Sequence, residues 1–278
     1  MKNILDTIGN TPLIRIGKIY AKLETINPSG SIKDRMAKYM VEKAEKRSAL
    51  KSGYTIIEAT SGNTGVSFAM IAALKGYRFI AVIPQKTSEG KKKLMKAFGA
   101  EFVLVPDTEG LMGAVRKTDE LAKSYKKVWL PKQFENPDNT EGHYKTTGQE
   151  ILKQINKVDV FVAGIGTGGT LMGVARALKE KFPKVKIFGV EAVESYHQIE
   201  GISDGIIPKI LDFNLIDGMI KIESEDAISM AKKLAKKYGL LVGISSGANV
   251  LAALKLSKKY KNVVTVLPDR AERYLELW

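Results

Sequence analysis

The sequence contains no cysteine and only two histidines, His143 and His197. The absence of cysteine excludes disulfide bonds, thiolate catalysis and cysteine-ligated metal sites. Two histidines also argue against a metal site made of histidines alone. No run reaches the roughly 18 apolar residues of a membrane-spanning helix, and the apolar part of the N-terminal segment is too short for a signal peptide. We therefore expect a soluble cytoplasmic protein with no metal and no membrane contact.

Positive charge is the most uneven feature of the composition. The 278 residues carry a formal net charge of +14, which in some proteins indicates a nucleic-acid partner. The lysines gather at helical spacing with almost no aromatic side chains between them, so solvated helix faces explain them better. We expect no nucleic-acid partner, and a positive field suits a phosphate cofactor and anionic substrates. The two clusters are Lys91, Lys92, Lys93 and Lys96, and Lys232, Lys233, Lys236 and Lys237.

Short apolar runs alternate with helical patterns along the chain. This alternation predicts an α/β fold in which helices cover both faces of mostly parallel sheets. The helix at 64–75 is apolar on nearly every side and should be buried. Another helix has Ser224 as its expected N-cap and Gly239 as its stop. The expected strands are 19–24, 54–59, 79–83, 102–105, 158–163, 186–191 and 263–267, and the expected helices are 34–47, 64–75, 88–98, 110–125, 142–156, 170–182, 225–238 and 247–260.

Three of the expected turns share one design. In each, a strand leads through a turn rich in glycine, serine or threonine into the start of a helix, where free N–H groups form an anion site. Such turns gather at the carboxyl ends of the strands in open parallel sheets. Three of them together predict a ligand with more than one anionic or acceptor group. The turns are 60–65 (TSGNTG), 164–170 (GIGTGGT) and 243–247 (GISSG).

Two of these turns also match motifs of other enzyme classes. Residues 164–169 fit G-x-G-x-x-G, and Glu191 ends the next strand, where a Rossmann fold places its ribose-binding acid. An NAD-dependent oxidoreductase is therefore an alternative, as are glycines that serve only a tight turn. Residues 243–247 fit G-x-S-x-G, but no histidine follows Ser245, which argues against a hydrolase. Ser245 would also suit a plain helix cap.

Lys33 follows the turn residues 27–30 at the entry of a helix. A surface lysine in a loop is the ordinary interpretation. Near a helix N-terminus, however, the charged form of an amine is disfavoured, which makes the amine a better nucleophile. The residues alone leave both interpretations open.

Taken together, these segments resemble the cysteine synthase and cystathionine β-synthase family of type II pyridoxal 5'-phosphate (PLP) enzymes. NPSGSIKDR at 27–35 resembles the family's cofactor-lysine motif, and TSGNTG its substrate loop. GTGGT at 166–170 resembles the phosphate loop, and GISSG the pyridine-nitrogen loop. IGNTPL at 8–13 and ERYL at 272–275 also look like family signatures. The resemblance runs in order through essentially the whole chain, which leaves the oxidoreductase interpretation little room.

The resemblance implies a two-domain type II PLP fold with the cofactor in the cleft between two α/β domains. The implied limits are 35–130 for a smaller domain, and 1–34 together with 131–278 for a larger one. A homodimer is the usual assembly of such enzymes, and a serine acetyltransferase is a candidate partner.

The resemblance also assigns residues to roles. By analogy, Lys33 forms a Schiff base with PLP and is the catalytic base. The other implied cofactor contacts are Asn63 for the ring hydroxyl, Gly166, Thr167, Gly168, Gly169 and Thr170 for the phosphate, and Ser245 for the pyridine nitrogen. The implied substrate contacts are Thr60, Ser61, Thr64 and Gln133, with Gly201 and Asp204 at the mouth of the site.

The implied reaction is β-replacement on an O-activated serine, as in cysteine synthase, where O-acetylserine and sulfide give cysteine and acetate. A replacement like that of cystathionine β-synthase, or an elimination like that of a cysteine lyase, is the alternative. Asp204 stands where cysteine synthases usually have a small residue. A carboxylate there would disfavour a phosphate leaving group and favour activation of a neutral nucleophile, but Ser-Asp-Gly is also a common turn sequence.

Overall fold

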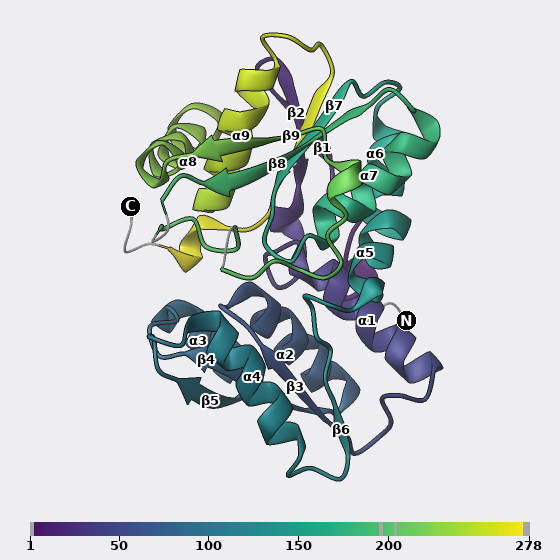
Figure 1. Ribbon diagram of the computed structural model, residues 1–278, viewed down its shortest axis with the longest axis vertical. Coiled ribbons are helices and arrows are strands. Elements are labelled where there is room, and N and C mark those ends of the chain that lie inside the picture. The colour runs from purple at the N-terminus through teal and green to yellow at the C-terminus, as the bar shows by residue number, and fades with distance from the viewer. Residues whose placement is uncertain (1–2, 195–196, 203–204, 275–278) are drawn as a thin grey trace.

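The computed structural model describes residues 3–194, 197–202 and 205–274. The chain forms two lobes, each built around its own sheet (Figure 1). The larger sheet has six strands in the order β1-β2-β10-β7-β8-β9, and the smaller sheet has four in the order β5-β4-β3-β6. Within the described residues, no helix is long and apolar enough to cross a membrane.

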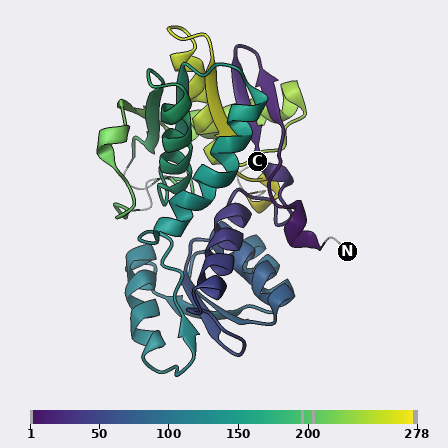
Figure 2. The ribbon, with the colours of Figure 1, turned by 90° about the vertical axis from the view of Figure 1, so that its right-hand side faces the viewer.

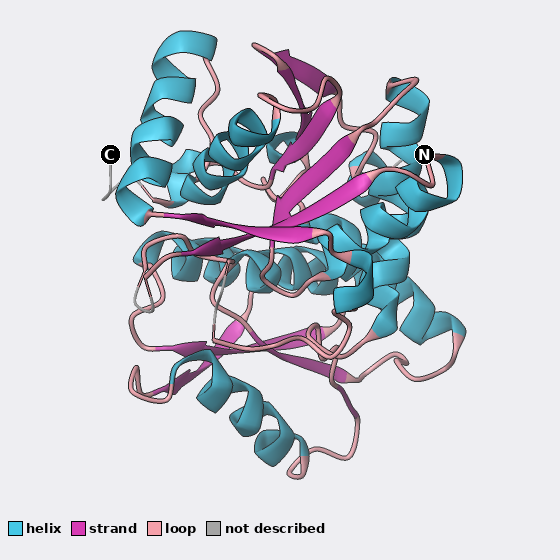
Figure 3. Ribbon diagram, turned by 45° about the horizontal axis from the view of Figure 1, so that its top comes forward, coloured by secondary structure: helices cyan, strands magenta, loops and turns pink. Residues whose placement is uncertain are grey.

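The larger sheet is parallel except for the antiparallel pair of β1 and β2 at its edge. Helices cover both of its faces, with α8 and α9 against one face and α7 against the other (Figure 3). The strands are β1 (Leu13–Ile16), β2 (Ile19–Leu23), β7 (Val160–Gly164), β8 (Lys186–Ala192), β9 (Gly218–Ile222) and β10 (Val263–Leu267). The helices are α6 (Gln149–Gln154), α7 (Gly169–Lys181), α8 (Ser224–Tyr238) and α9 (Ile244–Leu256).

The smaller sheet is parallel throughout. Helix α2 is buried along the whole stretch from Thr64 to Ala72, as its apolar sequence predicted. Helices α1 and α5 lie side by side where the two lobes meet (Figure 2). The strands are β3 (Thr55–Ala59), β4 (Arg78–Pro84), β5 (Glu101–Val105) and β6 (Val128–Trp129), and the helices are α1 (Lys33–Lys46), α2 (Asn63–Lys75), α3 (Glu89–Ala97), α4 (Gly110–Ala122) and α5 (Pro137–His143).

The predicted α/β fold with mostly parallel sheets is confirmed, and every expected strand is present. Strands β1, β6 and β9 were not expected, because β6 has only two residues and the other two are half-exposed edge strands without a long apolar run. All four strands of the smaller sheet come from residues 55–129. The limits of the two domains stay a prediction.

Two local expectations were wrong. The single helix expected at 142–156 is interrupted, because a π-helical turn at Tyr144–Gly148 separates α5 from α6. Ser224 is the first residue of α8 and not its N-cap. Its hydroxyl instead accepts a hydrogen bond from the Gln198 N–H at 3.1 Å, which ties α8 to the preceding loop.

Candidate active site

Two adjoining cavities lie at the carboxyl ends of the parallel strands, lined by residues of both lobes. The segment that contains Lys33 and the three glycine-containing turns all reach this place, although they are far apart in the sequence. Parallel strands bring the turns that follow them to one edge, so this convergence is a consequence of the fold. The residues that line both cavities are Lys33, Asn63, Gly166, Thr167, Glu200 and Gly201.

Lys33 is the first residue of α1. The turn before it is held by the buried carboxylate of Asp34, which accepts hydrogen bonds from the Ser29 N–H at 2.7 Å and from the Ser29 hydroxyl. The Ser67 hydroxyl on α2 donates to the same carboxylate at 2.6 Å. Burial raises the pKa of Asp34, although these hydrogen bonds oppose the rise. The start of α1 is therefore tied to α2, which fixes the position of the Lys33 backbone.

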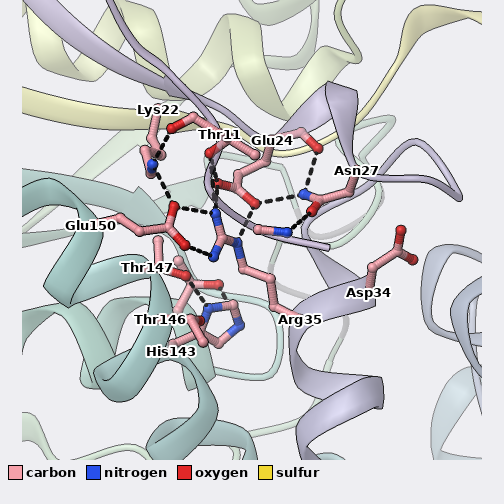
Figure 4. Close-up of polar contacts among 12 residues, drawn as sticks. Thr11, Lys22, Glu24, Asn27, Asp34, Arg35, His143, Thr146, Thr147 and Glu150 are labelled. Atoms are coloured by element: carbon pink, nitrogen blue, oxygen red, sulfur yellow. Dashed lines mark hydrogen bonds and ion pairs between the residues drawn. The ribbon is translucent and has the colours of Figure 1, made fainter. Parts of the chain in front are cut away.

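Arg35, on the next part of α1, lies in a buried ion network (Figure 4). Its guanidinium donates to Glu24 and to Glu150, each at 2.6 Å, and Lys22 donates to Glu150 at the same distance. Burial alone would raise the pKa of Glu150, but hydrogen bonds and charges from Arg35 and Lys22 hold it at about 2. Because Glu24 follows β2 and Glu150 lies on α6, the network ties α1 to the larger lobe.

The turn between β7 and α7 is a cradle that only glycine allows. A Cβ at Gly166 would overlap the carbonyl oxygen of Gly201, and one at Gly169 would overlap the side chain of Asn139. Gly168 has a φ of +82°, a conformation that side chains rarely adopt. The first N–H groups of α7 have no partner within the helix and point to this turn, so the turn suits an anion such as a phosphate.

His143 contacts the cradle through the side chain of Thr170. Its Nε2 lies 3.3 Å from the hydroxyl of Thr170, and its Nδ1 lies 2.9 Å from the hydroxyl of Thr147. Burial, together with the charges of Arg35 and Lys33, holds the pKa of His143 well below its usual value. The neutral ring has one donor and one acceptor. It therefore orients the hydroxyl of Thr170, which lines the cavity.

The amide of Asn63 is held in one orientation by residues near the end of the chain. Its Nδ2 donates to Asp269 at 2.6 Å, and its Oδ1 accepts from Arg273. Tyr274 donates to the same Asp269 carboxylate at 2.5 Å, and burial followed by the charge of Asp269 raises the pKa of Tyr274 well above its usual value. With its oxygen on a cation and its nitrogen on a carboxylate, Asn63 keeps one N–H to donate.

The turn at 60–65 places only some of its hydroxyls in the cavity. Ser61 lines the cavity. The hydroxyl of Thr60 is buried and accepts hydrogen bonds from the N–H groups of Gly62 at 2.9 Å and Gly65 at 3.1 Å. Thr60 therefore holds the shape of the turn, and the structure does not place it among the residues that line the cavity.

Thr64 and Gln133 both line the cavity and are bonded to each other. The hydroxyl of Thr64 donates to Oε1 of Gln133 at 2.7 Å, and Nε2 of Gln133 donates to the carbonyl of Ala59 at 2.7 Å. Gln133 thus joins α2 to the end of β3. The Gln133 side chain also hydrogen-bonds Glu58, so its amide oxygen is the end with a further hydrogen-bonding position.

Ser245 and Gly201 also line the cavity beside the glycine cradle. Helix α9 begins at Ile244 with Gly243 as its N-cap and no side-chain cap bond, so Ser245 is not the plain helix cap that its sequence allowed. Asp204 lies outside the described residues.

Lys91 corrects one expectation from the sequence. The expected solvated helix face includes it, but its side chain is only 1% exposed and lines the cavity. It forms an ion pair with Glu200 and lies 4.5 Å from the centre of the Tyr274 ring. The buried Met95 stands four residues further along α3, so the periodicity places Lys91 on the inner face of that helix.

Comparison with known proteins decides the family. The model of the family "pyridoxal-phosphate dependent enzyme" matches residues 4–269. The chain belongs to this family. Its cofactor is PLP, and it is an enzyme of the cysteine synthase type, as the sequence motifs predicted. This result argues against the NAD-dependent oxidoreductase.

Several relatives cover nearly the whole chain. Cysteine synthase B of Campylobacter jejuni is 47% identical over 290 residues, covering 99% of this chain and 97% of the relative. The crystal structure of an O-acetylserine-dependent cystathionine β-synthase from Helicobacter pylori matches with a TM-score of 0.95 and 42% identity, covering 99% and 97%. A hydrogen sulfide-producing enzyme from Fusobacterium nucleatum also matches with a TM-score of 0.95 and 42% identity, covering 99% of each chain.

The residues present fit PLP. A lysine amine for the cofactor's aldehyde lies in the same cleft as a glycine cradle and helix N-terminus suited to its phosphate. No group of three or more histidine, aspartate or glutamate side chains in the described part of the chain is placed to hold a metal ion.

Sequence reasoning missed four residues of the site: His143, Lys91, Glu200 and Asp269. Each acts through a contact between distant segments, such as the bond from Asp269 to Asn63. Arg273 and Tyr274 belong to a segment that the sequence flagged as a family signature, but it gave them no role. Only Lys91 could have been found from the sequence, because its spacing of four residues from Met95 places both on one face of the helix.

Proposed function

We propose that this protein is a cysteine synthase, which replaces the acetate of O-acetyl-L-serine with sulfide to give cysteine. The observation that carries the proposal is the convergence of Lys33, the glycine cradle and the 60–65 turn on one cleft. PLP, when bound, supplies the electron sink that makes the α-proton of the amino acid labile and lets the β-substituent leave. The names of the relatives support acetate as the leaving group.

The chain's own residues have separate tasks in this proposal. The Lys33 amine removes the α-proton of the substrate as a general base. Ser61, Thr64 and the first N–H groups of α2 bind the substrate carboxylate, and Gln133 holds Thr64 in place. Ser245 would bond the pyridine nitrogen of the cofactor, and the cradle at 166–170 would hold its phosphate. Thr60 supports this arrangement from within its turn.

The function is tested by supplying the purified protein with alternative substrates. We expect O-acetylserine with sulfide to give the highest kcat/KM for cysteine formation. O-phosphoserine, serine and cysteine are compared as the amino acid, and homocysteine as the nucleophile. A higher kcat/KM with homocysteine would support a cystathionine synthase, and sulfide release from cysteine as the fastest reaction would support a lyase.

Ser245 offers a prediction about how the cofactor's ring is tuned. A hydroxyl cannot stabilise a protonated pyridine nitrogen as a carboxylate can, and a less electron-poor ring favours loss of a β-substituent over other reactions. We expect Ser245→Ala to slow turnover moderately and Ser245→Asp to slow it far more. The measurements are kcat for cysteine formation and the absorbance spectrum of the bound cofactor.

Ser246 is the matched control for this substitution. Its hydroxyl is buried without a hydrogen-bond partner and does not line the cavity. Ser246→Ala should leave kcat unchanged, because it removes a hydroxyl that makes no hydrogen bond and does not reach the cavity. Wild-type rates for both Ser245 variants would show that Ser245 does not contact the ring.

The turn at 60–65 should recognise the substrate's carboxylate. L-amino acids are expected to change the cofactor's absorbance, whereas the corresponding amines without a carboxylate should not. Ser61→Ala should weaken amino-acid binding by about ten- to a hundredfold, the value of one hydrogen bond to a charged group. Spectral titration gives the dissociation constants of the amino acid and of the corresponding amine. Equal affinity for the two would disprove the assignment of the turn to the carboxylate.

The assembly and location of the protein stay proposals. We propose a cytoplasmic homodimer, by analogy with the family, and a serine acetyltransferase as a candidate partner. Light scattering of the purified holoenzyme tests the dimer directly, since a monomer mass at micromolar concentration would contradict it. No nucleic-acid partner is proposed.

A further inference from the structure

Lys91 lies inside the cleft, and its ammonium has one acidic partner among the described residues. Its side chain crosses the 60–65 turn so closely that a Cβ at Gly62 would overlap it. At its end, the ammonium pairs with Glu200 of the other lobe and lies against the face of the Tyr274 ring. Glu200 is 37% exposed and stands at the rim, whereas Lys91 is buried. The ion pair therefore bridges the two lobes across the cleft.

The enclosed space beside Lys33 is small. The cavity that Lys33, Ser61 and Lys91 line has a volume of about 30 Å³. A buried water needs roughly 10–15 Å³ on this measure, so the cavity has room for about two waters. An amino acid bound here shares this space with the Lys91 side chain, and a shift of that side chain separates its ammonium from Glu200.

A buried ammonium that loses its carboxylate needs another anion, because an unpaired charge inside a protein is costly. Glu200 is the only carboxylate among the described residues that line this cavity. The carboxylate of the amino acid has its own site at the 60–65 turn. The Lys91 side chain passes along that turn, with its Cε 3.0 Å from where a Cβ on Gly62 would stand, and its ammonium then pairs with Glu200, next to Gly201.

We propose that Lys91 forms a subsite for the small monoanions that leave and enter at the β-carbon of the substrate. This deepens the proposed function and rests on it. In that reaction the C–O bond breaks and acetate leaves with the electron pair, and hydrosulfide then forms the C–S bond. Both are monoanions of similar size, so one ammonium serves both steps. Glu200 is the resting partner that the anion replaces.

The proposal is tested with acetate as the probe, bound to the holoenzyme without turnover. Binding is followed through the cofactor's absorbance, with neutral acetamide as the isosteric comparison. The variants are Lys91→Met, Lys91→Arg and Glu200→Gln. The matched control is Lys92→Met, because the Lys92 ammonium on the same helix bonds the Gln85 carbonyl and Glu89 and does not line the cavity.

We expect Lys91→Met to weaken acetate binding about tenfold or more, the value of one charge-assisted hydrogen bond, and to leave acetamide unchanged. The KM for sulfide should rise with it, and Lys91→Arg should restore both. Glu200→Gln should tighten acetate binding by about two- to fivefold, because it removes a competing, partly exposed partner. Lys92→Met should behave as wild type.

Lys91→Met and Glu200→Gln are expected to change acetate affinity in opposite directions, which distinguishes an anion subsite from an ion pair with a purely structural role. If Glu200→Gln weakens acetate binding as Lys91→Met does, the ion pair only holds the lobes together and the proposal is wrong. Unchanged acetate binding in Lys91→Met would also overturn it. Failure of the proposed function gives a different result: wild type would form no cysteine from O-acetylserine, whatever its affinity for acetate.

Discussion

Replacing Lys33 with alanine is expected to abolish cysteine formation. Lys33 is the lysine at the start of α1, it lines both cavities of the cleft, and in the proposed function it carries the cofactor and removes the α-proton. Loss of a general base alone slows a reaction by about 10²–10⁴-fold. Loss of the covalent attachment adds to this, so we expect activity at the detection limit.

The attachment itself can be measured apart from activity. Reduction with borohydride followed by mass spectrometry should find the cofactor on the peptide that contains Lys33, and none there in Lys33→Ala. Lys38 is the control, because it lies on the same helix, is partly exposed and pairs only loosely with Glu42 at 3.9 Å. Lys38→Ala should keep full activity. A Lys33→Ala protein that retains both the modified peptide and its turnover would disprove the assignment.

The sequence was informative where chemistry depends on a local backbone conformation. The turn at 164–170 needs glycine because its backbone approaches Gly201 and Asn139. A run of glycines of this kind is visible in the sequence alone. The same holds for Lys33, which stands beside a run of turn residues at a helix start. The strands that lead to these turns were also predictable from their apolar runs.

The sequence was uninformative where a residue acts through a distant one. Lys91 is one of four lysines on a short helix, and only its spacing of four residues from the buried Met95 sets it apart from Lys92 and Lys93. The packing of α3 against the 60–65 turn shows that Lys91 points inward, whereas Lys92 is half-buried and Lys93 is exposed. Asn63 and Asp269 are 206 residues apart, so their hydrogen bond depends on how the two lobes meet.

Arg35→Met is expected to destabilise the fold strongly. Arg35 is 2% exposed, and its removal leaves the fully buried carboxylate of Glu24 without its cation. Among the described residues, Glu150 keeps Lys22 as its one cation, together with the N–H of Asn10 at 2.9 Å. Removing one partner of a buried ion pair costs about 3–5 kcal/mol, because the remaining charge stays buried. The measurement is the free energy of unfolding in urea, with wild type and variant at the same PLP concentration, since bound cofactor stabilises both.

A surface pair provides the control. Arg78 and Glu101 form an ion pair with a distance of 2.6 Å, the same as between Arg35 and Glu24, but their side chains are 49% and 52% exposed. Because water screens exposed charges, Arg78→Met should change the free energy of unfolding by at most about 1 kcal/mol. Equal effects of Arg35→Met and Arg78→Met would show that burial does not decide the cost.

The same network should make the stability of the wild type depend on acid. Burial alone would raise the pKa values of Glu24 and Glu150. For Glu24, Arg35 and Thr11 outweigh burial and lower the pKa. For Glu150, Arg35 and Lys22 lower the pKa to about 2. A carboxylate whose pKa is lower in the folded than in the unfolded state stabilises the fold above the unfolded pKa, near 4.5, and loses this contribution as the pH falls through the folded pKa. Stability should therefore fall between about pH 5 and pH 2.

Glu150→Gln should be less stable than wild type at pH 7 and should lose less on acidification, because it has one fewer such carboxylate. Parallel pH profiles of the two proteins in urea would rule out Glu150 as a source of the acid sensitivity.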